Sequence, residues 1–586
     1  MSDAAPGNAA VAPARVADDG TVAPAAASPA LPPDPAWWRH AVIYQVYIRS
    51  FADGNGDGIG DIAGVRARLP YLHDLGVDAI WFTPWYVSPM ADGGYDVADY
   101  RAIDPTFGSL AEAEALIREA LELGIRTIVD VVPNHVSDRH PWFQAALAAG
   151  PGSPERERFW FRPGRGPAGD EPPTGWTGEF KGTPWSRTAN ADGTPGEWYL
   201  HLFTAEQPDL NWNHPDVRAE HEAILRFWFD RGASGVRIDS AALLVKDPTM
   251  PEVPPDPGPG GHPTHDRDDL HEIYRGWRAV ADSYPGDRVL VGEVWLPDAE
   301  RFARFLRPDE LHTAFNFDFM ARPWDAAALR ESIDTTLAAH APVGAPATWV
   351  LSNHDVTRPV TRYGRQDSSF AFARKRFGTP SDTAVGRQRA RAAALLTAAL
   401  PGSLYLYQGD ELGLDEVDVP VDEIQDPMHA RSGGVDPGRD GCRVPLPWAG
   451  TEAPFGFSPA SSTGRTWLSQ PAHWAGLTVE AQAADAESML SLYRDALRIR
   501  RGEAALQGEE FAWLSSDPDV LAFSRGADFV CIANLSGRSV PLPLHSTLVV
   551  SSADTNDGHL PADATAWLRP GPAASGDQQG RVPDET

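Results

Sequence analysis

The feature that most constrains the fold is a repeated alternation of short apolar runs with segments of helical period. The run AVIYQVYI (41–48) is rich in β-branched and aromatic residues and predicts a strand. VRARLPYLHDLG then shows helical period and ends at Gly76, and the apolar run VDAIWFTP follows it. LAEAEALIREALELG repeats the helical pattern up to Gly124 and leads into IRTIVDVV. Such alternation predicts βαβ units around a parallel sheet.

The alternation yields eight predicted strands. They begin near residues 41, 78, 126, 235, 288, 312, 347 and 403. Eight parallel strands with helices between them predict an α/β fold of the (β/α)₈ or TIM-barrel type. One stretch, 137–212, interrupts the pattern after the third strand. It is rich in Gly, Pro, Trp and Phe without a long amphipathic run, so it predicts an inserted, irregular subdomain.

The domain boundaries follow from the same changes of pattern. We expect the barrel to span 36–136 and 213–503. Short strands separated by turn signals predict a C-terminal antiparallel β-domain over 504–570. The Ala- and Pro-rich residues 1–35 predict a disordered arm, and residues 571–586 predict a disordered tail.

Charge and cysteine content narrow the class of function. A net charge of −31 disfavours nucleic acid and anionic membranes as partners. The chain has neither a run of 18 apolar residues nor the apolar segment of a signal peptide, so we expect no membrane association. The two cysteines, Cys442 and Cys531, are too few for a disulfide framework and fit reduced thiols in a cytoplasmic protein. We expect the protein to be a monomer or homodimer. Twenty tryptophans favour a flat ligand such as a carbohydrate.

Polar side chains gather where the predicted strands end. Catalytic groups of such barrels lie at the C-terminal strand ends, so these side chains are expected to converge. They are Tyr95 and Asp96 after strand two, His135 after strand three, Arg237 and Asp239 in strand four, Glu293 after strand five, and His354 and Asp355 after strand seven. Any one acid could instead form a strand-end salt bridge or a helix cap, but the recurrence at several strand ends favours a site.

The acids suggest a specific chemistry. Arg237 and Asp239 are two residues apart on one strand, so both point to the same side, and a guanidinium beside a carboxylate keeps it ionised. An ionised carboxylate and a protonated one about 5 Å apart are the machinery of retaining glycoside cleavage. A third acid can stabilise the positive charge of the transition state. His135 and His354 could instead bind zinc, but no cysteine or HxxxH spacing supports that alternative.

These segments resemble a known family. DVVPNH, GVRIDS, GEVW and SNHD, in this order, resemble the signature regions of the α-amylase superfamily, glycoside hydrolase family 13. QPDLN (207–211), YQGDELGL (407–414) and RDGCRVPLPW (439–448) resemble its oligo-1,6-glucosidase and α-glucosidase branch.

The resemblance assigns a role to each matching residue. It implies that Asp239 is the nucleophile, Glu293 the general acid/base and Asp355 the stabiliser of the transition state. It implies sugar-binding roles for His135, Arg237 and His354, with Tyr95 stacked on the sugar ring and Asp96 bound to the non-reducing-end hydroxyls. An arginine would pair with Asp96 and close the pocket: Arg443 is the first choice and Arg439 the alternative. Arg358 is expected to face the aglycone side.

The implied activity is that of a retaining, exo-acting α-glucosidase that releases glucose from short α-glucosides. The residue after the nucleophile influences linkage in the family, and Ser240 at this position favours maltose-type α-1,4 substrates over α-1,6. The alternatives are an oligo-1,6-glucosidase, or a transferring or isomerising member such as a sucrose isomerase or trehalose synthase. A non-catalytic binding subunit would lack the acids, and an unrelated barrel enzyme would not share the motif order.

The loop DGNGDGIGD (53–61) follows the first strand. It begins like an EF-hand, but position twelve would be Gly64 and no helix precedes it, so a calcium switch is excluded. Loops of this form bind one Ca²⁺ or Mg²⁺ in the α-glucosidase branch. The ligands would be Asp53, Asn55, Asp57, the carbonyl of Ile59, and Asp61. The alternative is a glycine-rich turn that solvates its own charges, which mutual repulsion of the carboxylates disfavours.

Overall fold

The computed structural model describes residues 36–190, 192–462 and 464–571. The predicted arm, residues 1–35, and all of the predicted tail except Gly571 lie outside these residues. Among the helices described, none is long and apolar enough to cross a membrane.

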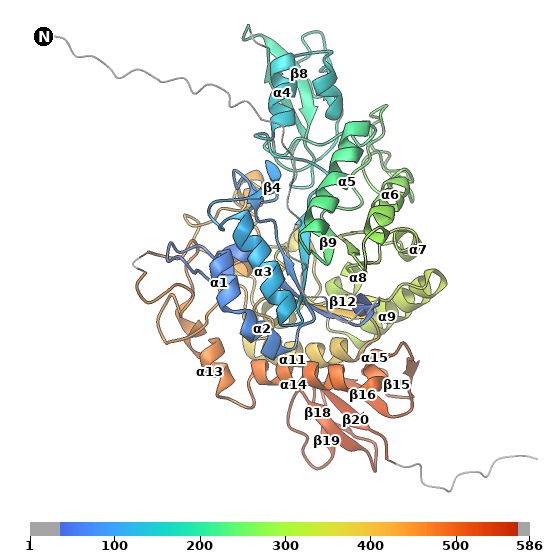
Figure 1. The fold of residues 1–586 in the computed structure, drawn as a ribbon. Coiled ribbons are helices and arrows are strands. Elements are labelled where there is room, and N and C mark those ends of the chain that lie inside the picture. The colour runs from blue at the N-terminus through green and yellow to red at the C-terminus, as the bar shows by residue number, and fades with distance from the viewer. Residues whose placement is uncertain (1–35, 191, 463, 572–586) are drawn as a thin grey trace, which may run out of the picture.

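Eight parallel strands form the central sheet, as predicted (Figure 1). They are β1 (Val42–Val46), β2 (Ala79–Phe82), β5 (Arg126–Val131), β9 (Gly235–Ile238), β10 (Val289–Gly292), β11 (Thr313–Ala314), β12 (Thr348–Val350) and β13 (Ser403–Tyr407). They are ordered β11-β10-β9-β5-β2-β1-β13-β12. The two end strands, β11 and β12, meet through a hydrogen bond between the hydroxyls of Thr313 and Thr348, and Asn316 N–H donates to the Thr348 carbonyl at 3.2 Å. These contacts bring the sheet close to a closed barrel.

Helices cover the outside of the barrel (Figure 1). They are α1 (Ile62–Ala67), α2 (Leu69–Leu75), α3 (Leu110–Glu122), α5 (Pro215–Asp230), α6 (Leu270–Asp282), α7 (Ala299–Arg304), α8 (Phe317–Ala321), α9 (Ala326–His340), α10 (Pro359–Tyr363), α11 (Thr383–Ala399) and α14 (Met489–Gly502). Helix α3 illustrates the local cause: Ser109 and Glu112 form a capping box, and Ala113, Leu116, Ile117 and Ala120 bury one face. The strands are buried on both sides, which explains their continuous apolar runs.

The insertion after β5 is more regular than the sequence indicates. It contains α4 (Pro141–Ala149) and a three-stranded antiparallel sheet of β6 (Phe161–Arg162), β8 (Pro195–Leu200) and β7 (Trp185–Ala189). A small aromatic core that includes Trp160, Trp176 and Trp185 supports it. The insertion after the third strand is therefore confirmed, and the structure adds a regular sheet to it. The sequence does not reveal this sheet because β6 has only two residues, and β7 (WSRTA) and β8 (PGEWYL) do not alternate apolar and polar residues. A short pair, β3 (Tyr86–Val87) and β4 (Asp99–Ile103), also frames the loop after β2.

The C-terminal strands form the predicted antiparallel domain. Its main sheet has the order β14 (Ala512–Trp513), β15 (Val520–Arg525), β16 (Phe529–Asn534), β20 (Ala564–Arg569), β18 (Thr547–Ser551), and β17 (Val540–Pro541) pairs with β19 (His559–Leu560). The sheet lies at the opposite end of the barrel from the insertion (Figure 1). It packs on α11, where the Trp567 indole donates to the Leu395 carbonyl at 3.0 Å. Short helices α12 (Pro427–Arg431), α13 (Val479–Ala483) and α15 (Ala504–Gln507) complete the chain. Cys442 and Cys531 are buried and unbonded to each other.

Candidate active site

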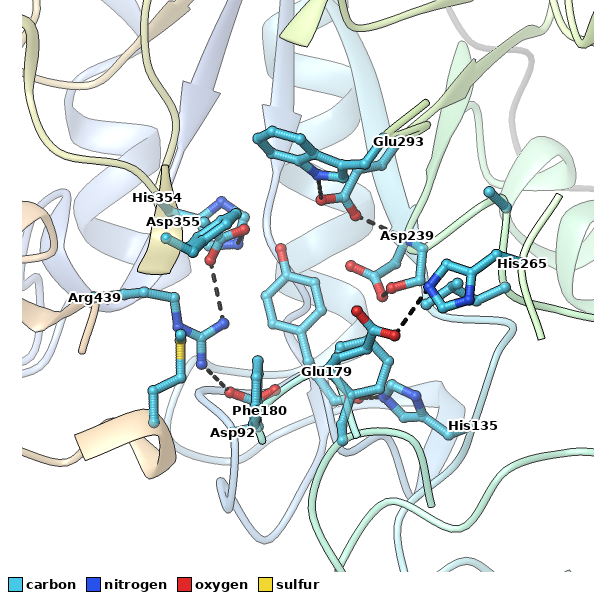
Figure 2. A pocket seen from close by; sticks show the side chains of 18 residues that line it. Asp92, His135, Glu179, Phe180, Asp239, His265, Glu293, His354, Asp355 and Arg439 are labelled. Carbon is cyan, nitrogen blue, oxygen red and sulfur yellow. Dashed lines mark hydrogen bonds and ion pairs between the residues drawn. The ribbon is translucent and has the colours of Figure 1, made fainter. Parts of the chain in front are cut away.

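A cavity of about 310 Å³ lies at the C-terminal end of the barrel, between the strand ends and the insertion (Figure 2). Seven of the eleven predicted catalytic and substrate-binding residues line it. The lining comprises Asp92, Tyr95, His135, Glu179, Phe180, Phe203, Asp239, Ser240, Ala242, Leu243, His265, Glu293, Trp295, His354, Asp355, Phe372, Met428 and Arg439. The carboxylates of Asp92, Glu179, Asp239, Glu293 and Asp355 are distributed around the cavity, together with several aromatic rings.

Arg237 links the two carboxylates that the sequence assigns to bond cleavage. Its Nη1 lies 2.7 Å from Asp239 Oδ1, and its Nη2 lies 2.7 Å from Glu293 Oε2. Nη1 also contacts Asp130 of β5 at 3.1 Å. Strands β5, β9 and β10 are neighbours in the sheet, which explains how their side chains meet. Because one guanidinium holds both carboxylates, they are close together, as retaining chemistry requires.

Ser240 forms a second bridge between these two carboxylates. Its N–H donates to Glu293 Oε2 at 2.9 Å, and its hydroxyl donates to Asp239 Oδ2 at 2.9 Å. The backbone φ of Ser240 is +47°, an unusual value for a residue with a side chain. A conformation of this kind persists only where the surroundings enforce it, and here it aims both donors of one residue at the reacting groups.

The protonation of the site follows from burial and from neighbouring charges. Burial raises the pKa of Glu293 to about 7; Arg237 opposes this, while Asp239 and Asp355 add to it. Burial also raises the pKa of Asp239, against the opposing effects of Arg237 and the Ser240 hydroxyl. A carboxyl with a pKa near 7 is suited to giving and taking a proton at neutral pH.

Asp355 differs from the other two acids because two arginines and a histidine contact it. Arg443 Nη2 lies 2.8 Å and Arg439 Nη1 lies 3.3 Å from its Oδ1, and His354 Nε2 lies 3.4 Å from Oδ2. Burial alone would raise the pKa of Asp355, but His354 and the arginines outweigh it and hold the pKa well below the usual range. Asp355 is therefore ionised whenever the protein is folded at ordinary pH.

The ion pair that closes one end of the cavity joins Arg439 to Asp92. Their Nη2 and Oδ1 atoms are 2.5 Å apart, and Arg439 Nε also contacts Asp426 at 2.6 Å. The predicted pairing of Asp96 with Arg443 was wrong. Both Asp96 oxygens accept backbone N–H bonds, from Ala91 at 2.9 Å and Asp92 at 3.1 Å, so Asp96 shapes the loop that presents Asp92. The alternative, Arg439, does line the cavity, but its partner at the closed end is Asp92 and not Asp96.

Arg358 does not face the aglycone side, which corrects the prediction. It is fully buried beside the barrel, where it donates to the carbonyls of Gln408 at 2.9 Å and Cys442 at 2.7 Å and lies over the Tyr407 ring. Arg443 also lies behind the cavity wall, donating to the His354 carbonyl at 2.8 Å as well as to Asp355. These two arginines fix the segments that carry His354 and Asp355.

Tyr95, His135 and His354, which were predicted to bind the sugar, line the cavity. The rings of Tyr95 and His354 stack, with centroids 5.2 Å apart and planes 8° apart. His135 Nε2 lies 3.0 Å from Gln207 Nε2 and 3.2 Å from the Tyr95 carbonyl. Burial lowers the pKa of His135 to about 4, so it is neutral at pH 7.

A buried network behind His135 was not predicted. Lys246 is fully buried, and its Nζ lies 2.8 Å from Asp209 Oδ2 and 2.5 Å from Asn134 Oδ1. Asp209 belongs to the QPDLN segment, and Asn134 precedes His135. The lysine therefore ties the loop after β9 to the insertion and to the end of β5.

Sequence reasoning also missed Asp92, Asp130 and Asp426. Asp130 stands inside the apolar run IRTIVDVV, and an acid in a buried strand is a usable signal of a polar partner. Burial raises the pKa of Asp130 to about 8, with Arg237 opposing. Asp92 and Asp426 lie in loops without periodicity, so only the fold reveals that both meet Arg439. Glu179 and His265, 3.0 Å apart, likewise come from two distant loops (Figure 2).

The DGNGDGIGD loop folds as a series of tight turns. Both Asp53 oxygens accept N–H bonds, from Gly56 at 2.6 Å and Gly58 at 2.8 Å, and Asp61 accepts from Gly54 and Gly64. Asn55 and Asp57 each accept from the N–H two residues further on. Burial raises the pKa of Asp61, and the charge of Asp53 raises it further. Within the described ranges, no group of three or more His, Cys, Asp or Glu side chains is arranged to hold a metal ion, so the cation stays a prediction.

Comparison with known proteins agrees with this geometry. The alpha amylase catalytic-domain family matches residues 45–509. The chain belongs to the alpha-amylase family. Within this alpha-amylase family it is 34% identical to a protein named probable alpha-glucosidase from Rhizobium meliloti (strain 1021), over 92% of this chain and 98% of that protein. It is also 34% identical to a trehalose-6-phosphate hydrolase from Escherichia coli (strain K12), over 86% of this chain and 92% of that protein.

A solved structure is similar over almost the whole chain. The crystal structure of an alpha-glucosyl transfer enzyme is similar with a TM-score of 0.79 and 33% identity, over 92% of this chain and 100% of that one. The family match covers most of the chain, and the barrel carries the three acids, so this alpha-amylase family member is a glycoside hydrolase. The predicted family and fold class are confirmed.

Proposed function

We propose that the protein is a retaining, exo-acting α-glucosidase that releases glucose from the non-reducing end of short α-glucosides. The observation that carries this proposal is the closed cavity end. Arg439 and its carboxylate partners Asp92 and Asp426 form a wall on one side of the cavity, and Asp239 and Glu293 lie on the other. A wall behind the first sugar leaves room for one glucose unit on the non-reducing side of the scissile bond.

The first step forms a glycosyl-enzyme. Asp239 Oδ attacks the anomeric carbon while the bond from that carbon to the glycosidic oxygen breaks, and Glu293 gives its proton to the leaving oxygen. The positive charge that develops on the sugar ring faces the ionised carboxylate of Asp355. In the second step Glu293 takes a proton from water, the water oxygen bonds to the anomeric carbon, and Asp239 leaves. Two inversions give retention of configuration.

We infer that the substrate is uncharged on its aglycone side. Arg439, the one arginine among the residues that line the cavity, lies at the closed end, away from the aglycone side, and its charge is already balanced there by Asp92, Asp355 and Asp426. Glu179 adds a further acid beside His265 at 3.0 Å. A phosphate group would meet more negative than positive charge there. This distinguishes the proposed substrate from that named for the trehalose-6-phosphate hydrolase relative.

Linkage is proposed from Ser240, the residue after the nucleophile. This small side chain is turned toward the carboxylates, because its hydroxyl donates a hydrogen bond to Asp239. We propose α-1,4 substrates such as maltose, in line with the family tendency for small or hydroxylated residues at this position. Hydrolysis of isomaltose much faster than maltose would contradict this choice.

A second candidate is transfer of the glucosyl group to an acceptor other than water. Its support is the similarity to an alpha-glucosyl transfer enzyme. Both reactions share the glycosyl-enzyme, so product analysis separates them. We expect incubation with maltose, isomaltose, sucrose, trehalose and starch to give free glucose as the main product, with maltose preferred. A rearranged disaccharide or a longer oligosaccharide as the main product would support transfer instead.

We also propose that the DGNGDGIGD loop binds one Ca²⁺ or Mg²⁺ that stabilises the fold. The donor set consists of oxygen atoms only, from Asp53, Asn55, Asp57, Asp61 and the Ile59 carbonyl, and hard cations prefer such donors. Repulsion between Asp53 and Asp61, both buried, would be relieved by a cation. The loop contributes no group to the catalytic cavity, so the ion has a structural role.

A further inference from the structure

The carboxylate of Glu293 is held unequally at its two oxygens. Oε2 accepts from Arg237 Nη2 at 2.7 Å and from Ser240 N at 2.9 Å. Oε1 accepts from the indole Nε1 of Trp295 at 3.2 Å. Trp295 is two residues beyond Glu293 in the segment GEVW. The proposed mechanism gives this tryptophan no role.

This asymmetry decides where the catalytic proton resides. A guanidinium and a backbone N–H can only donate, so a proton on Oε2 would point at other donors. The proton of the neutral acid therefore belongs on Oε1. An oxygen that carries a proton can still accept the indole N–H through its lone pairs, so Trp295 contacts Glu293 both before and after proton transfer.

The indole is fixed by aromatic neighbours. Trp295 stacks on Phe317 of α8, with centroids 3.8 Å apart and planes 8° apart, and it meets the edge of Phe372 at 5.5 Å. It is 37% exposed at the cavity mouth. A tryptophan has only two side-chain torsions, and here one ring face is stacked and a second ring makes an edge contact, so the direction of its N–H is largely set by packing.

We propose that Trp295 is a positioning residue that holds Oε1 of the acid/base in line with the glycosidic oxygen and stabilises the charge that forms there. As Glu293 loses its proton, Oε1 becomes a carboxylate oxygen, and a hydrogen bond to a charged acceptor is stronger than one to a neutral acceptor. The contact therefore favours the transition state over the ground state. This inference rests on the proposed role of Glu293 as acid/base.

The test uses Trp295→Phe, which keeps an aromatic ring on Phe317 and removes the N–H. Losing a donor to the ionised form raises the pKa of Glu293, against the unchanged influence of Arg237, Asp239 and Asp355. Activity requires protonated Glu293, so the alkaline limb of kcat/KM should move to higher pH, by about 0.5–1 unit. We expect kcat on maltose to fall about tenfold with little change in KM. An α-glucosyl fluoride, which needs less acid assistance, should be affected far less.

Matched variants separate this role from general packing. Phe203→Leu alters another cavity aromatic, one that packs on His135, and should leave the alkaline limb in place whatever its effect on KM. Phe317→Leu loosens the indole without touching it and should shift the limb as Trp295→Phe does, by less. If Trp295→Phe were poorly folded, Phe317→Leu would carry the test.

The outcomes are distinguishable. A pH profile of Trp295→Phe that superimposes on that of the wild type would overturn the inference while leaving the proposed function intact. A wild-type protein that cleaves none of the α-glucosides, the fluoride included, would instead overturn the proposed function.

Discussion

Replacing Arg439 by Met tests the closed end of the cavity. The side chain is buried, and it contacts Asp92 at 2.5 Å, Asp426 at 2.6 Å and Asp355 at 3.3 Å. Burial alone would lower the pKa of Arg439, but these three carboxylates outweigh it and raise the pKa well above the usual range. Methionine fills a similar volume without the charge, so the variant leaves buried carboxylates without their cation.

The size of the effect follows from that geometry. Removing one partner of a buried ion pair costs about 3–5 kcal/mol in unfolding free energy, because the remaining charge stays desolvated. For catalysis, a hydrogen bond from a charged group to a sugar hydroxyl is worth about 1.5–3 kcal/mol, which corresponds to a loss of roughly 10- to 100-fold in kcat/KM. We expect both losses in Arg439→Met, measured by thermal unfolding and by initial rates on maltose.

A double-mutant cycle with Asp92→Asn isolates the pair. Because the double variant removes both charges, its stability should be higher than the sum of the two single effects predicts, by about 1–3 kcal/mol. The closed end also predicts that longer maltooligosaccharides lose single glucose units in the wild type. If Arg439→Met retained wild-type stability and wild-type kcat/KM, or if the wild type released maltose from internal bonds, the argument for an ion-paired wall would be refuted.

A pH profile with the variant Glu293→Gln and a chelation experiment test the acid/base residue and the DGNGDGIGD loop. Because burial raises the pKa of Glu293 to about 7, kcat/KM should fall as pH rises through about 7, and Glu293→Gln should lose this alkaline limb while keeping partial activity on substrates with good leaving groups; full activity on maltose would contradict the assignment. Chelation with EDTA should lower the thermal unfolding midpoint while leaving turnover in the cold nearly unchanged if the DGNGDGIGD loop binds a structural cation; an unchanged midpoint would contradict the ion.

The sequence predicted the barrel well because its signals are local. Short runs rich in β-branched residues such as IRTIVDVV favour strands buried on both faces, and the structure has β5 there at Arg126–Val131. The acids Asp239, Glu293 and Asp355 could be predicted for the same reason, since the first two directly follow such a run and Asp355 lies five residues after one. Strand ends converge in a barrel whatever the loops do.

The loop contacts were harder to predict from the sequence because they join residues that are far apart in the chain. Arg439 meets Asp92 across 347 positions in sequence, and no pattern in either segment predicts that contact. Asp96 is adjacent to Tyr95 in an apparent motif, but its carboxylate is used by the backbone of its own loop. Arg358 follows Asp355 closely, yet its side chain turns to the carbonyls of Gln408 and Cys442 behind the cavity. Asp96 and Arg358 stand close in sequence to residues that line the cavity, but their side chains point away from it.

The central claim is that Asp239 forms a covalent bond to the sugar while Glu293 transfers the proton. A fluorinated α-glucosyl fluoride that reacts quickly in the first step and slowly in the second would trap the glycosyl-enzyme. Peptide mass spectrometry of the trapped protein should then find one glucosyl group on Asp239, and Asp239→Asn should acquire none while keeping the wild-type unfolding midpoint to within a few degrees. A label on another residue, or turnover of the reagent by Asp239→Asn at the wild-type rate, would contradict the account.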